Sequence, residues 1–251
     1  MTKPKDSFFV GYADKLPPMD RRAMVILGGA GIAGAALAGA KLAVHQQARG
    51  SGSWDQAKIV DLTGMVEQSP YPVLRTVSLD GQMRSVSLVC SNKCGVSAQL
   101  AQFDGKPVWV RGSVIARGRH RLLAVVSDAE WVGPAQNASP VHAVQEEYLG
   151  RAALNGEILD AKCWTGAMRP GVGKTHKSCA SLCIRMGGTP WFLAKDKAGK
   201  RAVFVLTGPR GEPLRDEILS LVGEPVRASG KLIRRDDLVQ FRVDPATIHS
   251  V

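Results

Sequence analysis

Aromatic residues are scarce in this chain, which has only six Phe, five Trp and three Tyr among 251 residues. Acidic residues are also few, since 22 Asp and Glu stand against 33 Lys and Arg and leave a net charge of +11. The basic residues are spread along the sequence and not gathered with aromatics, so a base-stacking platform for nucleic acid is poorly supplied. We therefore expect no nucleic-acid partner and assign the charge to anionic lipid headgroups or an acidic partner, with a solvated surface as the default.

Recognisable catalytic combinations are equally scarce. Ser91, Ser178 and Ser181 have no His and Asp companions that the sequence reveals, and His120 and His142 stand alone. A lone histidine is more often a packing or surface residue than a catalytic one, although its pKa makes it a tempting candidate. The sequence leaves enzymatic activity open and favours a protein that is not an enzyme.

Only one long run lacks charge, the eighteen residues from Ala23 to Ala40. Such a length is the minimum for a helix that crosses a bilayer, so we expect a transmembrane anchor over residues 23–44. The positive-inside rule places the tail, residues 1–22, in the cytoplasm and the rest of this single-pass chain in the periplasm, at a bacterial inner membrane. The basic residues of the tail are Lys3, Lys5, Lys15, Arg21 and Arg22.

A rival interpretation treats the same segment as an export signal. Paired arginines at positions 21 and 22, directly before a mildly apolar stretch, look like a twin-arginine signal. Residues 38–40, Ala-Gly-Ala, would then serve as a small-residue cleavage site. We favour the uncleaved anchor, because the tail carries aromatic residues of the kind that hold spans at the membrane interface, namely Phe8, Phe9 and Tyr12.

The part after the anchor contains an internal repeat. Residues 105–117 align without a gap on residues 223–235, an offset of 118, and the flanking strands and short helix follow in the same order. About five short strands around one helix predict an OB-like, partly open barrel in each half. The expected fold is therefore mainly β: a transmembrane helix, a linker over 45–55, a first OB-like barrel over 56–133, a linker over 134–147 and a second OB-like barrel over 148–251.

The second copy carries an insertion. Leu62 matches Leu154 at an offset of only 92, against 118 for the later segments, so the second copy has gained residues in between. A segment that only one copy contains needs a reason of its own, and loops on a rigid β scaffold commonly supply a function. The alternative is that the insertion, which we expect to be helical, simply caps an open barrel end.

Three of the five cysteines fall inside this insertion, together with one histidine. Cys163, His176, Cys179 and Cys183 form the ligand set of a tetrahedral Zn²⁺ site, and the last three share one face of a helix by their spacing. Other metals stay open, and one disulfide with a spare thiol, or buried inert thiols, are the alternatives. Around the cluster we expect a supporting residue and two cations that lower the pKa of the thiols: Asp160, Lys174 and Lys177.

The other two cysteines, Cys90 and Cys94, lie where a strand of the first barrel gives way to its helix. An oxidising compartment favours a local disulfide between them, which is our expectation. Metal binding and a redox-active pair are the alternatives.

Four segments of the second copy carry a family resemblance: GEILDAKCW at 156–164, GKTHKSCASLC at 173–183, GGTP at 187–190 and VGEPVRASG at 222–230. Through them, residues 150–250 resemble a widespread but poorly characterised family of exported bacterial small-barrel proteins. The resemblance implies that the cysteines and the histidine of the insertion correspond to the repeated Cys and His positions of that family. It implies no established activity.

From these features we interpret the chain as a membrane-anchored periplasmic protein that acts as a non-catalytic subunit or accessory factor of an integral membrane complex, such as a respiratory or redox complex. Its distinctive part is a metal or redox Cys/His site. One alternative is a thiol-disulfide or metal-handling factor, in which thiols of the cluster cycle. The other is a purely structural interaction protein stapled by disulfides.

Overall fold

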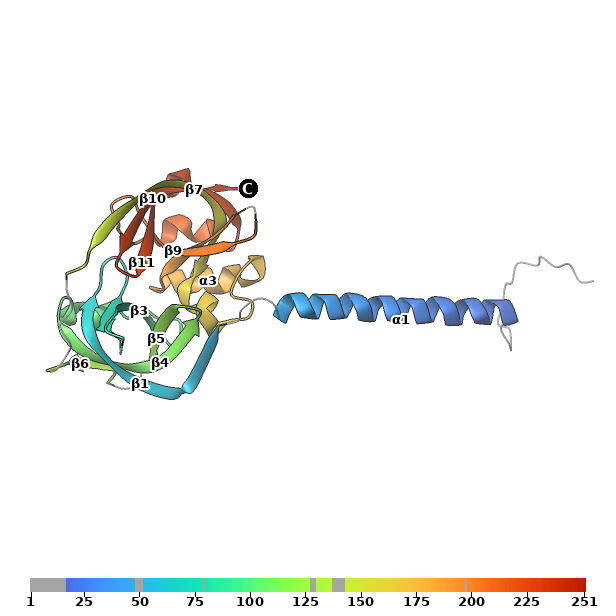
Figure 1. Cartoon of the computed structure of the whole chain (residues 1–251), viewed down its shortest axis with the longest axis horizontal. Helices are drawn as coiled ribbons and strands as arrows, with labels where there is room; N and C mark the ends of the chain where they lie inside the picture. The colour runs from blue at the N-terminus through green and yellow to red at the C-terminus, as the bar shows by residue number, and fades with distance from the viewer. Residues whose placement is uncertain (1–16, 48–51, 79, 127–129, 137–142, 197) are drawn as a thin grey trace, which may run out of the picture. The chain divides into compact units, whose positions relative to one another are not determined.

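The computed structural model in Figure 1 describes residues 17–47, 52–78, 80–126, 130–136, 143–196 and 198–251, apart from the side chains of residues 43–47. The chain divides into two compact units, residues 1–50 and residues 51–251, which we treat separately. The basic and aromatic residues of the tail before Pro17, the predicted linker residues 48–51 and His142 lie outside the described residues.

The first unit contains one long helix, α1 (Pro18–Gln47). Residues Pro18–Leu42 are long and apolar enough to cross a membrane, with a mean hydropathy of 1.8. The helix begins five residues before the predicted start at 23, so Arg21 and Arg22 belong to its first turns and not to a preceding tail. A signal sequence would pass the same test of length and composition, so this helix supports a membrane segment without deciding between anchor and signal.

The second unit is mainly β, and its first sheet closes into a barrel. Strand β1 pairs with both β2 and β4, so the ring β1-β2-β3-β5-β4 returns to β1. All pairings in the ring are antiparallel except that of β3 with β5. Its elements are β1 (Ser53–Glu67), β2 (Val73–Val77), β3 (Met83–Cys90), α2 (Ser97–Leu100), η1 (Ala101–Phe103), β4 (Pro107–Arg117), β5 (His120–Val125) and β6 (Val132–Pro134).

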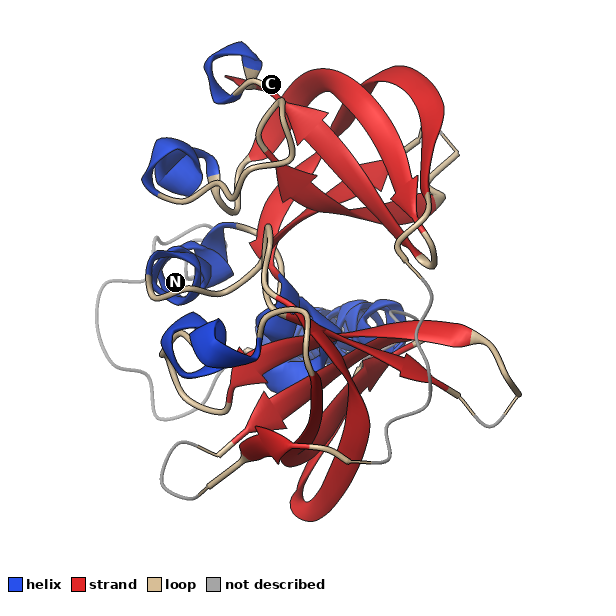
Figure 2. Ribbon diagram, turned by 90° about the vertical axis from the view of Figure 1, so that its left-hand side faces the viewer, coloured by secondary structure: helices blue, strands red, loops and turns tan. Residues whose placement is uncertain are grey.

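The second sheet pairs its strands in the same sequence. Its order is β11-β9-β8-β7-β10-β12, with a further pairing of β10 with β11 and a parallel pairing of β11 with β9. Three helical segments stand between its first two strands, and one follows the third (Figure 2). The elements are β7 (Glu146–Asp160), η2 (Cys163–Ala167), η3 (Lys174–His176), α3 (Lys177–Arg185), β8 (Pro190–Lys195), β9 (Arg201–Thr207), η4 (Asp216–Leu221), β10 (Pro225–Arg235), β11 (Leu238–Val243), η5 (Pro245–Thr247) and β12 (His249–Ser250).

The strand registers follow the offsets that the sequence shows. Gly64 of β1 pairs with Val108 of β4, and Gly156 of β7 pairs with Val226 of β10. Gly64 and Gly156 hold equivalent positions that are 92 residues apart in sequence, and Val108 and Val226 hold equivalent positions that are 118 residues apart. The extra length falls in the β7–β8 connection, residues 161–189, whereas the β1–β2 connection is only residues 68–72. All three cysteines of the predicted cluster lie in this longer connection.

Each sheet has its own core, and a third apolar cluster joins the two. Ile115 and Leu122 of the first sheet pack in one cluster with Leu159 and Trp191 of the second. Tyr71 belongs to the same cluster, and its buried hydroxyl donates to the carbonyl oxygen of Leu206 at 2.9 Å. The two sheets are therefore held in a fixed arrangement by buried apolar surface.

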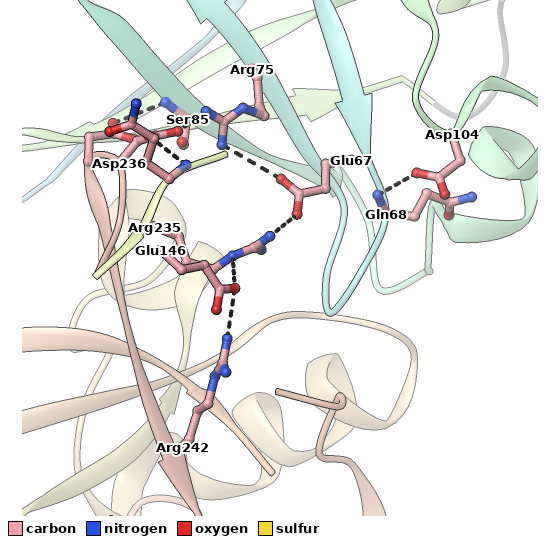
Figure 3. A network of polar contacts seen from close by, with 11 residues as sticks. Glu67, Gln68, Arg75, Ser85, Asp104, Glu146, Arg235, Asp236 and Arg242 are labelled. Atoms are coloured by element: carbon pink, nitrogen blue, oxygen red, sulfur yellow. Dashed lines mark hydrogen bonds and ion pairs between the residues drawn. The ribbon is translucent and has the colours of Figure 1, made fainter. Parts of the chain in front are cut away.

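A chain of ion pairs joins the two sheets at a second place (Figure 3). Glu67 at the end of β1 accepts from Arg235 of β10 at 2.6 Å and lies 3.7 Å from Arg75 of β2. Arg75 also pairs with Asp236 in the β10–β11 turn, and Arg235 lies 2.9 Å from Glu146. Because these side chains are mostly buried, the network fixes the angle between the sheets more strongly than exposed ion pairs would.

Candidate metal centre

The candidate site begins at the buried end of β7. Ile158, Leu159 and Asp160 are almost completely buried, and the chain then enters the π-helical turn η2 at Cys163. Burial forces this strand end to satisfy its polar groups internally. The Asp160 side chain does so by accepting a hydrogen bond from the backbone N–H of Cys163 at 2.8 Å. Asp160 thus has the supporting position that the sequence predicts.

Three sulfur atoms converge at this point. The Sγ atoms of Cys163, Cys179 and Cys183 all lie within 4.8 Å of one another, and those of Cys163 and Cys183 are 4.0 Å apart. Cys179 and Cys183 are one turn apart on α3, which aligns their side chains, and η2 brings Cys163 over that face. Cys163 and Cys183 are buried, while Cys179 is half-buried. Such a group of thiols can hold a metal ion.

The pKa values of the two buried thiols, Cys163 and Cys183, are shifted in opposite directions. A hydrogen bond joins the sulfur atoms of Cys163 and Cys183 and lowers the pKa of the Cys183 thiol. The same hydrogen bond, together with burial and the neighbouring Asp160 carboxylate, raises the pKa of Cys163. Burial also raises the pKa of Asp160.

His176 is not a member of the group of three converging thiols. It is the residue before α3, it is buried, and burial lowers its pKa. Its Nε2 atom has no hydrogen-bond partner among the described residues. A buried ring nitrogen without a partner is costly, and a metal ion would satisfy it. The spacing of His176, Cys179 and Cys183 keeps all three on one side of the helix.

Lys174 and Lys177 both face Glu224. Their ammonium groups form ion pairs with it, at 3.2 and 3.0 Å, and the Lys174 side chain is largely exposed, so their predicted effect on the thiols stays a prediction. Among the groups that lower the pKa of the Cys183 thiol are the ammonium groups of Lys162 and Lys93. The sequence offers one signal that could have found Lys162, because it stands between Asp160 and Cys163 in a stretch whose neighbours are buried.

The disulfide loop of the first sheet borders the site. Cys90 and Cys94 are bonded through their sulfur atoms, with Cα atoms 5.5 Å apart. Lys162 donates to the carbonyl oxygen of Cys90 at 3.0 Å and to that of Asn92. On the other side of the loop, a Cβ added at Gly95 would lie 2.8 Å from the carbonyl oxygen of Met186, so the backbones are in direct contact. The disulfide loop is therefore fixed against the turn that follows α3.

An aromatic cluster lies between the sheets and was not predicted. His120 packs against Trp164 and Trp191, with ring centroids 5.6 and 5.2 Å away. The guanidinium of Arg117 lies 4.4 Å from the centre of the Trp164 ring. Burial and the neighbouring Arg119 and Arg121 lower the pKa of His120 to about 4. His120 is thus a packing residue, as its isolation in the sequence indicates.

Searches of protein-family models, curated proteins and solved structures find no match for this chain. The resemblance of residues 150–250 to exported small-barrel proteins therefore stays a prediction. The chemistry of the site has to be argued from its own side chains, which offer three thiols, one unpartnered imidazole nitrogen and one buried carboxylate.

Proposed function

We propose that this chain is a membrane-anchored, periplasm-facing accessory subunit that holds one Zn²⁺ ion through Cys163, His176, Cys179 and Cys183. The observation that carries the proposal is the convergence of three thiol sulfurs within 4.8 Å in a folded, largely buried setting. Thiolates and imidazole are the ligands that zinc prefers in structural sites. The ion would tie η2 and α3 together.

The sulfur positions fit such an ion. Sulfur ligands about 2.3 Å from a tetrahedral zinc lie about 3.8 Å from each other. The Cys163 and Cys183 sulfurs are 4.0 Å apart, so a small closure of the site brings them to that spacing. His176 supplies the fourth ligand by turning its unpartnered Nε2 toward the sulfurs. Four ligands from the chain leave no open position for a substrate, which favours a structural role over catalysis.

The scaffold supports a binding role. The ring of five strands in the first half, with a helical segment between the third and fourth strands, is the arrangement of an OB-like barrel, and the second half repeats its strand pairings. We take both as OB-like barrels, with the β7–β8 connection as a helical Cys/His insertion in the second. Barrels of this kind present loops and a sheet face to partners, which suits a subunit that docks on a larger complex.

The first unit supplies the attachment. We propose that α1 crosses the inner membrane with Arg21 and Arg22 on the cytoplasmic side, which places residues 52–251 in the periplasm. The net charge of +11 draws the soluble part toward anionic lipid headgroups or an acidic surface of an integral membrane complex, such as a respiratory or redox complex. Membership of the exported small-barrel family is part of this proposal.

Metal analysis of the full-length chain in detergent tests the metal site. We expect about one zinc per chain. We expect loss of that zinc in Cys183→Ser and in His176→Gln, with full zinc in the matched variants Leu182→Ser and His249→Gln, which alter exposed residues. Full zinc content in Cys183→Ser would remove the ligand assignment. A wild-type chain without zinc, in which the three thiols are paired or inert, would favour the disulfide-stapled interaction protein.

A further inference from the structure

The disulfide loop of the first sheet and one thiol of the cluster border the same cavity. Cys90 and Cys94 of the disulfide loop and Cys183 of α3 line the same small cavity, together with Asp160 and Lys162. The disulfide comes from the first sheet and the thiols from the second, so residues about ninety positions apart in sequence share this space. Nothing in the zinc site itself requires a disulfide at this position.

The elements on both sides of the cavity are held in place. Lys162, which directly precedes Cys163, donates to backbone carbonyls of the disulfide loop from a buried position. Gly95 and Gly187 approach so closely that a Cβ added at Gly187 would lie 2.9 Å from the Cα of Gly95. Burial and hydrogen bonds of this kind favour lasting proximity over a chance encounter. The disulfide therefore remains beside the cluster.

We propose that the Cys90–Cys94 disulfide exchanges with the Cys163–Cys183 thiol pair when the cluster holds no metal. The site is then a thiol-disulfide relay between the two barrels, and its substrate is the protein's own disulfide. This inference rests on the proposed zinc site and adds its regulation, because sulfur atoms bound to zinc are not available for exchange and sulfur atoms joined in a disulfide cannot bind zinc.

The exchange is balanced within the chain. The thiolate sulfur of Cys183 forms a bond to one sulfur of the Cys90–Cys94 disulfide, and the other sulfur leaves as a thiolate. The sulfur of Cys163, 4.0 Å from that of Cys183, then bonds to Cys183 and releases the first sulfur. The Cys163 proton passes to the leaving thiolate. Two electrons move from the Cys163–Cys183 pair to the Cys90–Cys94 pair, and no external oxidant or reductant takes part.

The consequence is a chain with two stable states. In one state the cluster binds zinc and the disulfide closes the loop of the first barrel. In the other state Cys163 and Cys183 are bonded, the loop is reduced and the metal is gone. Each state contains one disulfide and three thiols. The structure has the same numbers, with the Cys90–Cys94 disulfide and three free cysteines.

Disulfide mapping of the full-length chain in detergent tests the relay. Trypsin separates the partners, because Cys90, Cys94 and Cys163 fall in residues 85–93, 94–111 and 163–174, and Cys179 and Cys183 in 178–185. Zinc-loaded protein is treated with EDTA without oxygen, quenched with acid, alkylated and digested. We expect the bond between 85–93 and 94–111 to be replaced by one between 163–174 and 178–185, while the alkylated thiols stay at three per chain.

Three controls sharpen the result. Cys179→Ser leaves Cys183 as the only cysteine in its peptide, and we expect exchange to persist in it. The double variant Cys163→Ser/Cys179→Ser lacks a resolving thiol, so we expect a trapped bond from 178–185 to 85–93 or 94–111. The zinc content before EDTA is measured separately, so a chain that never bound zinc is distinguished from one that binds zinc without exchanging.

The relay is overturned if zinc-loaded wild-type protein loses its zinc and keeps only the Cys90–Cys94 bond, with no mixed disulfide in the double variant. A rise or fall in the number of free thiols during the experiment would also count against it, because internal exchange conserves that number.

Discussion

The ammonium group of Lys162 donates a hydrogen bond to the backbone carbonyl oxygen of Cys90 across 3.0 Å. This contact joins the residue that precedes Cys163 of the candidate site with the disulfide loop of the first sheet. It also places a positive charge where it lowers the pKa of the Cys183 thiol. One buried side chain thus connects the fold, the disulfide and the candidate site, and several expected outcomes depend on it and its neighbours.

Replacing Lys162 with Met should destabilise the soluble part by about 1–3 kcal/mol, because carbonyl oxygens of the disulfide loop lose a charged donor while remaining buried. Urea unfolding followed by circular dichroism measures the change. Lys58→Met, at an exposed position, is the matched control and should unfold like the wild type. Equal stability of the two variants would show that Lys162 does not fix the loop.

Asp236→Asn should lower the free energy of unfolding by about 3 kcal/mol, because it breaks the buried ion pair with Arg75. This value is the lower end for such a loss, since Glu67 remains 3.7 Å from Arg75 and still balances part of its charge. Asn suits the left-handed backbone at this position, where φ is 51°, so the substitution changes charge and not conformation. Unfolding in urea is again the measurement.

The exposed pair between Asp80 and Arg84 provides the comparison for that experiment. Asp80→Asn removes the same charge from the same kind of partner, but solvent already screens it, so we expect little change in stability. Similar losses in the two variants would contradict a special contribution from the network between the barrels. Removing both charges in Arg75→Met/Asp236→Asn should recover part of the loss.

His120 should make the soluble part less stable as the pH falls from about 7 toward 4. Its folded pKa of about 4 lies below the usual value of 6.5, so the unfolded chain binds the extra proton in this range. The contribution is complete above the unfolded pKa and is lost as the pH approaches the folded one. His120→Phe should keep the packing against Trp164 and Trp191 and flatten this part of the profile. Identical profiles in both proteins would rule out the effect.

The internal repeat could be predicted from the sequence because the features that reveal it, turn glycines and buried apolar positions, are local. Gly105 and Gly223 both adopt positive φ, at 68° and 73°, directly before matching strands, so the same turn requires glycine at both places. Leu100 and Ile218 are both completely buried at equivalent positions of the helical segments. Turn residues and the spacing of apolar residues are local sequence patterns, so both can be recognised without the tertiary structure.

The contacts between the barrels could not be predicted in this way. The pairing of Glu67 with Arg235 and the packing of His120 between Trp164 and Trp191 depend on how the two sheets are placed against each other. The hydrophobic periodicity of the sequence does not specify how the two sheets are placed. For the same reason the ion pairs of Lys174 and Lys177 with Glu224 could not be predicted from the sequence.

Asp160→Ala should weaken zinc binding about 10- to 100-fold, because it removes the acceptor that orients Cys163. Asp160→Asn keeps an oxygen acceptor at the same place and should lose less. Competition with a chromogenic chelator measures both affinities. An unchanged affinity in the alanine variant would show that the carboxylate does not support the ligands.

Protease added to intact spheroplasts should digest residues 52–251 and leave a tag at the N-terminus protected, because the proposed function has α1 cross the membrane once with its N-terminus in the cytoplasm. An uncleaved anchor keeps the chain in the membrane fraction. A soluble periplasmic product that begins near Ala40 would instead identify the segment as a cleaved signal, and protection of the soluble part would reverse the proposed orientation.

X-ray absorption at the zinc edge of the purified full-length chain tests the metal centre most directly. We expect three sulfur neighbours at about 2.3 Å and one nitrogen at about 2.0–2.1 Å. Cys183→Ser should lose the bound zinc. A zinc shell made only of oxygen and nitrogen, with the three sulfurs absent from it, would contradict the proposal that Cys163, Cys179 and Cys183 hold the ion.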